Sequence, residues 1–137
     1  MSRYISDPLL QLVAERANHR CEYCLIPEAN SFYNFQVDHI ISLKHGGQTK
    51  EGNLAFACSL CNRSKGSDLG TVLEGESAIV RFYNPRKDKW TDHFAWEEDG
   101  LILSKTSIGG ATIKIFGFNH PDSVLERKLL ISAGLYP

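Results

Sequence analysis

Three side chains between positions 38 and 62 are suited to cutting a phosphodiester bond. Asp38 and His39 are adjacent in an apolar segment, and Asn62 directly follows a cysteine. Histidine titrates near neutral pH, where a general base is most effective. Carboxylate and amide oxygens suit Mg²⁺ or Mn²⁺ better than zinc, and such a cation stabilises the transition state of phosphate hydrolysis. The pattern predicts His39 as the base that activates water, with Asp38 and Asn62 as ligands of a catalytic cation.

Asn53 is predicted to support this site by bracing the backbone. It follows a Gly-rich segment, residues 42–52, whose ends must return close together, and its amide can bridge backbone groups across that loop. Asp38 and His39 can serve one site only if the strand twists or bulges, because successive strand side chains point to opposite faces. Each residue alone has a commoner structural explanation, but their joint occurrence between two cysteine pairs favours a site.

The four cysteines predict a structural zinc site. They form two widely separated C-x-x-C pairs, Cys21 with Cys24 and Cys58 with Cys61. In a reducing compartment such pairs are typical of zinc ligands, and two pairs complete a tetrahedral set of four thiolates. A redox dithiol and unused buried thiols are the alternatives. Because Asn62 follows the last cysteine, the structural metal would also fix the position of a ligand of the catalytic metal.

The charge balance is unusual for a protein that binds nucleic acid. The formal net charge is −1, from 15 Lys and Arg against 16 Asp and Glu, whereas a free-standing DNA-binding domain usually carries excess positive charge. Local clusters nevertheless determine the field at a site. Lys44 with His45, and Arg63 with Lys65, are predicted to contact phosphate; an exposed loop and a solvated helix face are the alternatives. The balance predicts weak binding or a small footprint.

The composition is that of an ordinary globular protein. Hydrophobic residues make up 42% and charged residues 23% of the chain, which excludes the disordered and collagen-like classes. The sequence has no run of about eighteen apolar residues, and its first eight residues lack the apolar core of a signal peptide. We therefore expect a cytoplasmic protein that does not contact membranes.

The residue pattern predicts helices at both ends of the chain and short strands between them. A first helix is expected over residues 7–18, capped by Ser6 or Asp7, and a strand over residues 36–41. A short helix should follow the second cysteine pair and stop at Gly66. The remaining expectations are strand-like segments at 78–83, 90–96, 101–103 and 111–116, and a last helix that begins near Pro121.

The motifs C-x-x-C, V-D-H-I-I, a G-G loop, N-L and C-x-x-C-N-R-x-K-G follow one another in this order. Together they closely resemble the HNH endonuclease family over about residues 18–67. The resemblance implies an α+β protein with a ββα-metal core and a structural zinc, which we expect within residues 1–70. Residues 71–137 are expected to form a small antiparallel β-rich extension with a helix, packed on the same domain.

The resemblance also implies a role for each site residue. His39 is the general base, Asp38 and Asn62 are ligands of the catalytic metal, Asn53 braces the loop, and the four cysteines bind the structural zinc. Many members of the family have histidine where this chain has Asn62. The loss of an imidazole points further toward Mg²⁺ or Mn²⁺.

The expected reaction is hydrolysis of DNA to 5′-phosphate and 3′-hydroxyl ends, by a monomer or a homodimer. One alternative is a zinc-stabilised nucleic-acid-binding module without activity. Another is a nuclease subunit that cuts only when a targeting partner protein delivers it to DNA, which the near-neutral charge leaves open.

Overall fold

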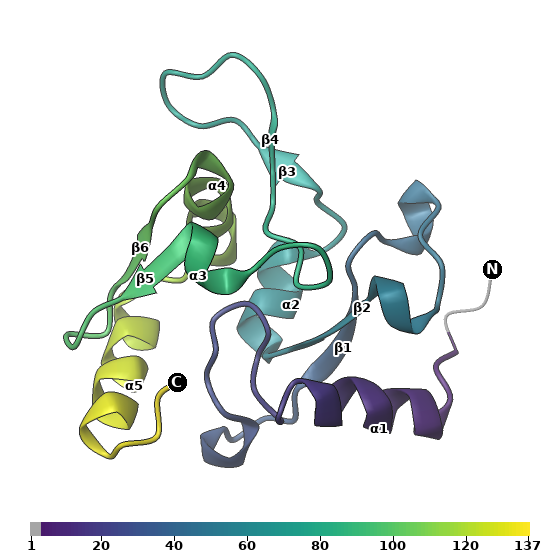
Figure 1. Ribbon diagram of the computed structural model, residues 1–137, viewed down its shortest axis with the longest axis horizontal. Helices are drawn as coiled ribbons and strands as arrows, with labels where there is room; N and C mark the ends of the chain where they lie inside the picture. Colours follow the sequence, from purple (N-terminus) through teal and green to yellow (C-terminus); the bar gives the residue numbers. More distant parts are fainter. Residues whose placement is uncertain (1–3) are drawn as a thin grey trace. The chain divides into compact units, whose positions relative to one another are not determined.

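The computed structural model describes residues 4–137, which divide into two compact units (Figure 1). The first unit ends at Ser67, and the second runs from Asp68 to Pro137.

Unit 1 is built around a β-hairpin that leads into a helix. Its elements are α1 (Asp7–Arg16), the 3₁₀ turn η1 (Glu28–Asn30), β1 (Gln36–His39), η2 (Leu43–His45), η3 (Glu51–Asn53), β2 (Leu54–Ala57) and α2 (Ser59–Lys65). The two strands pair antiparallel, with Gln36 opposite Ala57 and His39 opposite Leu54. This ββα arrangement confirms the predicted core.

The first helix begins where the sequence predicts and ends two residues early. Ser6 is its N-cap and accepts a hydrogen bond through its hydroxyl. Pro8 lies in the first turn, where its missing N–H leaves no helical hydrogen bond unmade. At the other end, Arg16 donates from Nη2 to the backbone carbonyls of Glu51 and Leu54. The arginine thereby joins α1 to the start of β2.

The predicted strand over residues 36–41 is shortened by two residues at its C-terminal end. The Ile40 amide donates to the backbone carbonyl of Asn53, and the Ile41 amide donates to the Asn53 side chain, both at 2.9 Å. These bonds replace the strand ladder because the chain turns away into the Gly-rich loop. The hydrogen bonds to Asn53 therefore fix the backbone immediately after His39, the last residue of the strand.

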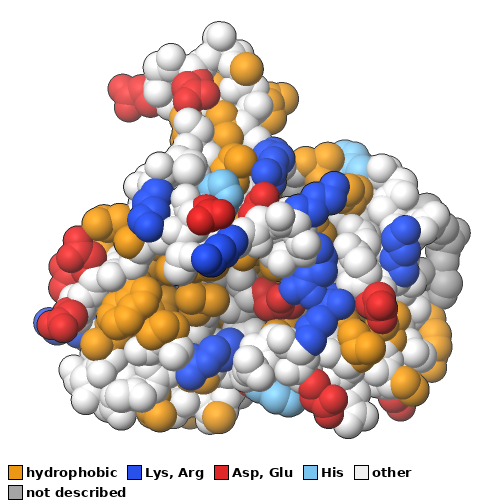
Figure 2. Space-filling model, in the orientation of Figure 1, with side chains coloured by type: hydrophobic (Ala, Val, Ile, Leu, Met, Phe, Trp, Pro, Cys, Tyr) orange, Lys and Arg blue, Asp and Glu red, His pale blue; other side chains and the backbone are white. Residues whose placement is uncertain are grey.

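Unit 2, which is described in full, contains two small antiparallel sheets and three helices. Its elements are β3 (Gly70–Thr71), β4 (Val80–Arg81), α3 (Trp90–His93), β5 (Phe94–Trp96), β6 (Ile102–Ser104), α4 (Ser107–Phe116) and α5 (Pro121–Ser132). β3 pairs with β4, and β5 pairs with β6. The segment between β3 and β4 projects from this unit in Figure 1, and Figure 2 shows acidic side chains at its end. Glu74 and Glu76 lie in this segment, and both are exposed.

Residues 111–116 are helical, so the strand expected there is wrong. They belong to α4, on which Thr112 and Phe116 are fully buried one helical turn apart. The apolar residues of this segment are thus also spaced as they would be on the buried face of a helix. Gly109 permits a close approach of α4 to the chain near β5, because a Cβ at this position would lie 2.2 Å from the carbonyl oxygen of His93.

The other expectations for unit 2 hold in part. The segment 90–96 is only half strand, because its first four residues form α3. The segment 78–83 contributes only two residues to β4. The last helix begins at Pro121 as predicted. Across residues 4–137, no helix has the length and apolar character required to cross a membrane.

A buried arginine connects three segments of unit 2. Arg127 in α5 is 1% exposed and donates from Nε to the Gly100 carbonyl at 2.6 Å. Its Nη2 donates to the Phe118 carbonyl and to Oδ1 of Asn119. Asn119 in turn bonds both backbone groups of Ile102 in β6, at 2.8 and 2.9 Å. The guanidinium therefore holds α5 against the turns that flank β6 and α4.

Replacing Arg127 by Met should lower the free energy of unfolding of unit 2 by about 3 kcal/mol, because three buried acceptors lose their donor. Both tryptophans of the chain, Trp90 and Trp96, lie in this unit. Urea unfolding followed by tryptophan fluorescence therefore measures the effect. Lys128→Met, at the exposed neighbouring position, is the matched control and should change the unfolding free energy by less than about 0.5 kcal/mol. Equal stability of the Arg127 variant and the wild type would contradict this role.

Candidate active site

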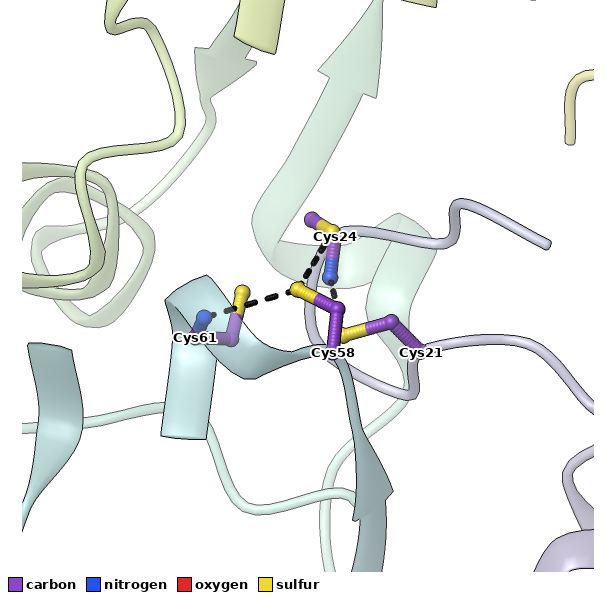
Figure 3. Close-up of side chains that lie close together, drawn as sticks. All are labelled: Cys21, Cys24, Cys58 and Cys61. Atoms are coloured by element: carbon purple, nitrogen blue, oxygen red, sulfur yellow. Dashed lines mark hydrogen bonds between the residues drawn. The ribbon is translucent and has the colours of Figure 1, made fainter. Parts of the chain in front are cut away.

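The two cysteine pairs meet in unit 1 and form one four-sulfur cluster (Figure 3). Cys21 and Cys24 lie in the turn after α1, whereas Cys58 and Cys61 lie at the start of α2, and all four are buried. Their sulfur atoms lie within 4.8 Å of one another, and the Sγ atoms of Cys24 and Cys58 are 3.7 Å apart. A tetrahedral zinc site with Zn–S bonds of about 2.3 Å requires S···S distances of about 3.8 Å. The cluster therefore fits a structural zinc ion.

The four buried thiols strongly influence one another's ionisation. Burial raises the pKa of Cys21, but hydrogen bonds from the other three thiols outweigh burial and hold this pKa well below its usual value. Burial and the neighbouring thiols raise the pKa of Cys61 well above its usual value. Hydrogen bonding alone thus stabilises one thiolate. Four buried thiolates require the charge of a divalent cation.

The first cysteine turn is fixed to the hairpin by its backbone. Glu22 donates from its amide to the Phe56 carbonyl at 2.8 Å, and its Oε1 accepts a hydrogen bond from the Phe56 amide at 2.9 Å. The Cys21 amide donates to the Ile26 carbonyl at 2.9 Å, which closes the turn. Leu25 lies within this turn at a φ of 68°. The sulfur cluster and β2 therefore form one rigid body within unit 1.

Asp38, His39 and Asn62 line one open cavity of unit 1 with a volume of about 380 Å³. The remaining lining residues are Val37, Ser42, Leu43, Lys44, Gly66 and Ser67. The fold thus brings together the end of β1 and the middle of α2. Asp38 is 4% exposed and its neighbour His39 is half-buried. Asp38 and His39 are the last two residues of β1, and both line the cavity.

Both carboxylate oxygens of Asp38 accept hydrogen bonds from the interior. The Tyr23 hydroxyl donates to Oδ2 at 2.7 Å, and the Lys65 ammonium lies 3.2 Å from Oδ1. Burial raises the pKa of Asp38, whereas Lys65 and Tyr23 oppose that shift. Burial and the Asp38 charge raise the pKa of Tyr23 well above its usual value, so its hydroxyl stays protonated. The carboxylate is thus oriented by two buried donors.

The His39 ring is oriented by the Gly-rich loop. Its Nε2 lies 2.9 Å from Oγ1 of Thr49, ten residues further along the chain. A hydrogen bond between a ring nitrogen and a positioned hydroxyl orients the plane of the imidazole. Asn62 has a similar support in β1, because its Nδ2 donates to Oε1 of Gln36. With Nδ2 engaged, the Asn62 oxygen Oδ1 is the atom able to bind a cation.

Asn53 bridges the loop in the way that the sequence predicts. Its Oδ1 accepts from the Ile41 amide, and its Nδ2 donates to the carbonyls of Ile41 and Gln48, each at 2.9 Å. Gly47 packs directly against this bridge. A Cβ at position 47 would lie 1.7 Å from the Ile41 carbonyl oxygen and 2.9 Å from the Asn53 amide nitrogen. The loop therefore closes only with glycine at this position.

The four residues expected to contact phosphate occupy different environments. Lys44, His45 and Arg63 are exposed, and Lys44 lines the cavity. Lys65 is 3% exposed and its ammonium is bonded inside the protein. Its predicted contact with phosphate therefore does not agree with the structure. Its stem extends inward from α2 because Asp38 provides a buried counter-charge.

Sequence reasoning missed three supporting residues of the site: Tyr23, Thr49 and Gln36. Tyr23 donates a hydrogen bond to Asp38 through its hydroxyl. Its position inside the first C-x-x-C pair is a signal that could have linked it to the cluster. No sequence pattern singles out Thr49 or Gln36, because each contact depends on how the loop and the helix return to β1.

A comparison with protein-family models matches residues 21–68 to the family described as HNH endonuclease. The matched segment begins at the first cysteine of the cluster, ends one residue beyond unit 1, and contains every residue that lines the cavity. No curated protein and no solved structure matches significantly. The family match and the sulfur cluster indicate a nuclease or another function related to nucleic acid.

Replacing Cys58 by Ser should abolish stoichiometric zinc binding and destabilise unit 1, because a structural zinc site contributes folding energy directly. Elemental analysis should find one zinc per wild-type chain and much less in the variant. Thermal unfolding followed by far-UV circular dichroism should show a lower melting temperature. Ser64→Ala in the same helix is the control. A Cys58→Ser protein that melts at the wild-type temperature would show that the four-cysteine assignment is wrong.

Replacing Gly47 by Ala should open the loop, because the new methyl group overlaps the Ile41 carbonyl. The Ile41 amide, which bonds Asn53, should then exchange with deuterium at least about ten times faster, a loss of about 1.4 kcal/mol of local protection. Gly52→Ala is the matched control, since a Cβ there meets no atom within 4 Å. Unchanged protection of Ile41 in the Gly47 variant would contradict this packing argument.

Proposed function

Residues 21–68 form an HNH domain, and we propose that this domain makes the protein a metal-dependent DNA endonuclease that hydrolyses phosphodiester bonds. The observation that carries the proposal is the single cavity lined by Asp38, His39 and Asn62. A carboxylate, an imidazole and an amide at one site supply a base and cation ligands together. These are the groups that hydrolysis of an unactivated phosphodiester requires.

His39 is the general base in this proposal. Its imidazole removes a proton from a water molecule, and the water oxygen attacks the phosphorus atom. The bond between phosphorus and the 3′ oxygen breaks, which leaves a 5′-phosphate; the departing oxygen takes a proton from solvent and becomes a 3′-hydroxyl. Thr49 supports this role because its hydroxyl contacts Nε2 at 2.9 Å and holds the ring against the loop.

Asp38 and Asn62 are the proposed ligands of the catalytic cation, Mg²⁺ or Mn²⁺. Their donor set fits such a cation, because hard divalent ions prefer oxygen ligands and Mg²⁺ needs only one or two protein ligands beside water and substrate phosphate. Such a cation balances charge on the phosphate and on the departing oxygen. The two donors come from β1 and α2, so the packing of these elements sets their separation.

DNA is the proposed substrate, and few positively charged side chains are available to bind its phosphates. Lys44 lines the cavity, and the exposed His45 and Arg63 each follow a cavity residue directly in the sequence. All three are suited to phosphate contacts that position a strand without reading its bases. Residues 1–67 contain seven Lys and Arg against six Asp and Glu. We therefore expect weak, strongly salt-dependent binding. A targeting partner or a second copy of the chain would raise the affinity. One such site cuts one strand.

Incubation with supercoiled plasmid tests this function directly. The wild-type protein should produce nicked circles with Mg²⁺ or Mn²⁺ and none with chelator. His39→Ala should reduce the rate at least about 100-fold, the usual contribution of a general base. His120→Asn is the matched control, because His120 lies in unit 2 as an N-cap and asparagine also caps helices.

Two results would overturn the proposal. Nicking by His39→Ala at the wild-type rate would exclude His39 as the base. A wild-type protein that retards DNA in a gel but never cuts it, with any of Mg²⁺, Mn²⁺ or Zn²⁺, would instead establish a zinc-stabilised nucleic-acid-binding module.

A further inference from the structure

We propose that Tyr23 and Lys65 are positioning residues that hold the Asp38 carboxylate ready for the catalytic cation, and that they tie the affinity for this cation to the two cysteine turns. The inference rests on the proposed function, because it takes Asp38 as a ligand. It adds two residues with assigned contacts and a physical link between the two metal sites.

Tyr23 carries this link from the first cysteine turn. It lies between Cys21 and Cys24, is 0% exposed, and donates to Oδ2 of Asp38 at 2.7 Å. The ring cannot move without moving the turn, whose shape is fixed by the two thiols and by the Glu22 contacts with β2. A displacement of the first cysteine turn would therefore also displace the Tyr23 hydroxyl that orients Asp38.

Lys65 carries the same link from the second cysteine turn. It lies on α2, one helical turn after Cys61, and is 3% exposed. Its ammonium donates to Oδ1 of Asp38 at 3.2 Å, to the His39 carbonyl at 2.9 Å and to the Gly66 carbonyl at 3.4 Å. These bonds use all three donors of the group. One ammonium thus fixes both a proposed metal ligand and the backbone of the proposed base.

The two donors orient the carboxylate without saturating it. A carboxylate has about four lone pairs, two on each oxygen. Tyr23 and Lys65 engage one on each oxygen from the interior side. The other lone pairs remain available on the side where Asp38 lines the cavity. Hydrogen bonds to a ligating carboxylate from such outer partners typically change metal affinity or activity about 10- to 100-fold.

A buried ion pair can also be purely structural, so the test must measure cation binding itself. Zinc-loaded protein is titrated with Mn²⁺, and the free Mn²⁺ is measured by electron paramagnetic resonance. Tyr23→Phe removes only the hydroxyl. It should raise the Mn²⁺ dissociation constant at least about 10-fold, while the zinc content stays at one ion per chain. Lys65→Met removes a donor to Asp38 together with a nearby positive charge, so Tyr23→Phe is the variant that tests positioning alone.

Tyr83→Phe is the matched control. Tyr83 is also a buried tyrosine, but it lies in unit 2, so its variant should bind Mn²⁺ as the wild type does. Asp38→Asn defines the background from other sites. Affinity of Tyr23→Phe within about twofold of wild type would overturn the inference, as would an equal loss in Tyr83→Phe.

The same titration separates this inference from the proposed function. If Asp38→Asn binds Mn²⁺ as tightly as the wild type, Asp38 is not a ligand, and both this inference and the ligand role of Asp38 in the proposed function fail. If Asp38→Asn loses the site and Tyr23→Phe keeps it, only the positioning role fails. Plasmid nicking at increasing Mn²⁺ gives a second readout. Tyr23→Phe should then need about 10-fold more Mn²⁺ for half-maximal rate.

Discussion

The structure of unit 1 depends on four thiolates that must share one cation. Over residues 4–67, this unit has only two short strands and two α-helices of ten residues or fewer, so its apolar core is small. Buried thiolates without a cation would cost several kcal/mol each. With zinc, the cluster joins two turns separated by most of the unit. The hairpin between these turns is then held at both ends, and its loop is braced internally by Asn53.

The cluster also determines where the candidate site can form. Asn62 follows one zinc ligand directly, and Tyr23 lies between two others. Lys65 adds a contact from the same helix as Asn62. The site residues are thus positioned from two sides by segments that a zinc ion in the cysteine cluster would fix. An active site tolerates displacements of less than about 1 Å, and a hairpin with four-residue strands would not hold such tolerances without this frame.

The sequence predicts the parts of unit 1 that depend on local spacing. The cysteine pairs, the Asp38–His39 dipeptide and the helix stop at Gly66 follow from spacing and residue type, and the loop-closing amide of Asn53 follows from the glycines before it. Side-chain direction is harder to predict. Lys65 has the pattern of an exposed helix residue, and only the buried Asp38 carboxylate explains why it turns inward. The strand predicted for residues 111–116 is wrong because a short apolar segment with partial alternation fits a strand and a helix equally well.

Because the Lys65 side chain points into the protein, it must be left out when the positive surface charge of unit 1 is counted. Lys65 and Asp38 neutralise each other inside the fold, so Lys65 adds no positive charge to the surface of unit 1. The positive charge at the surface of unit 1 is therefore smaller than its number of basic residues suggests. Electrostatic attraction to DNA scales with the phosphates that exposed cations neutralise. In the proposed nuclease, Lys65 therefore organises the site and does not capture substrate, and a bound divalent cation would supply much of the positive charge that a phosphate meets.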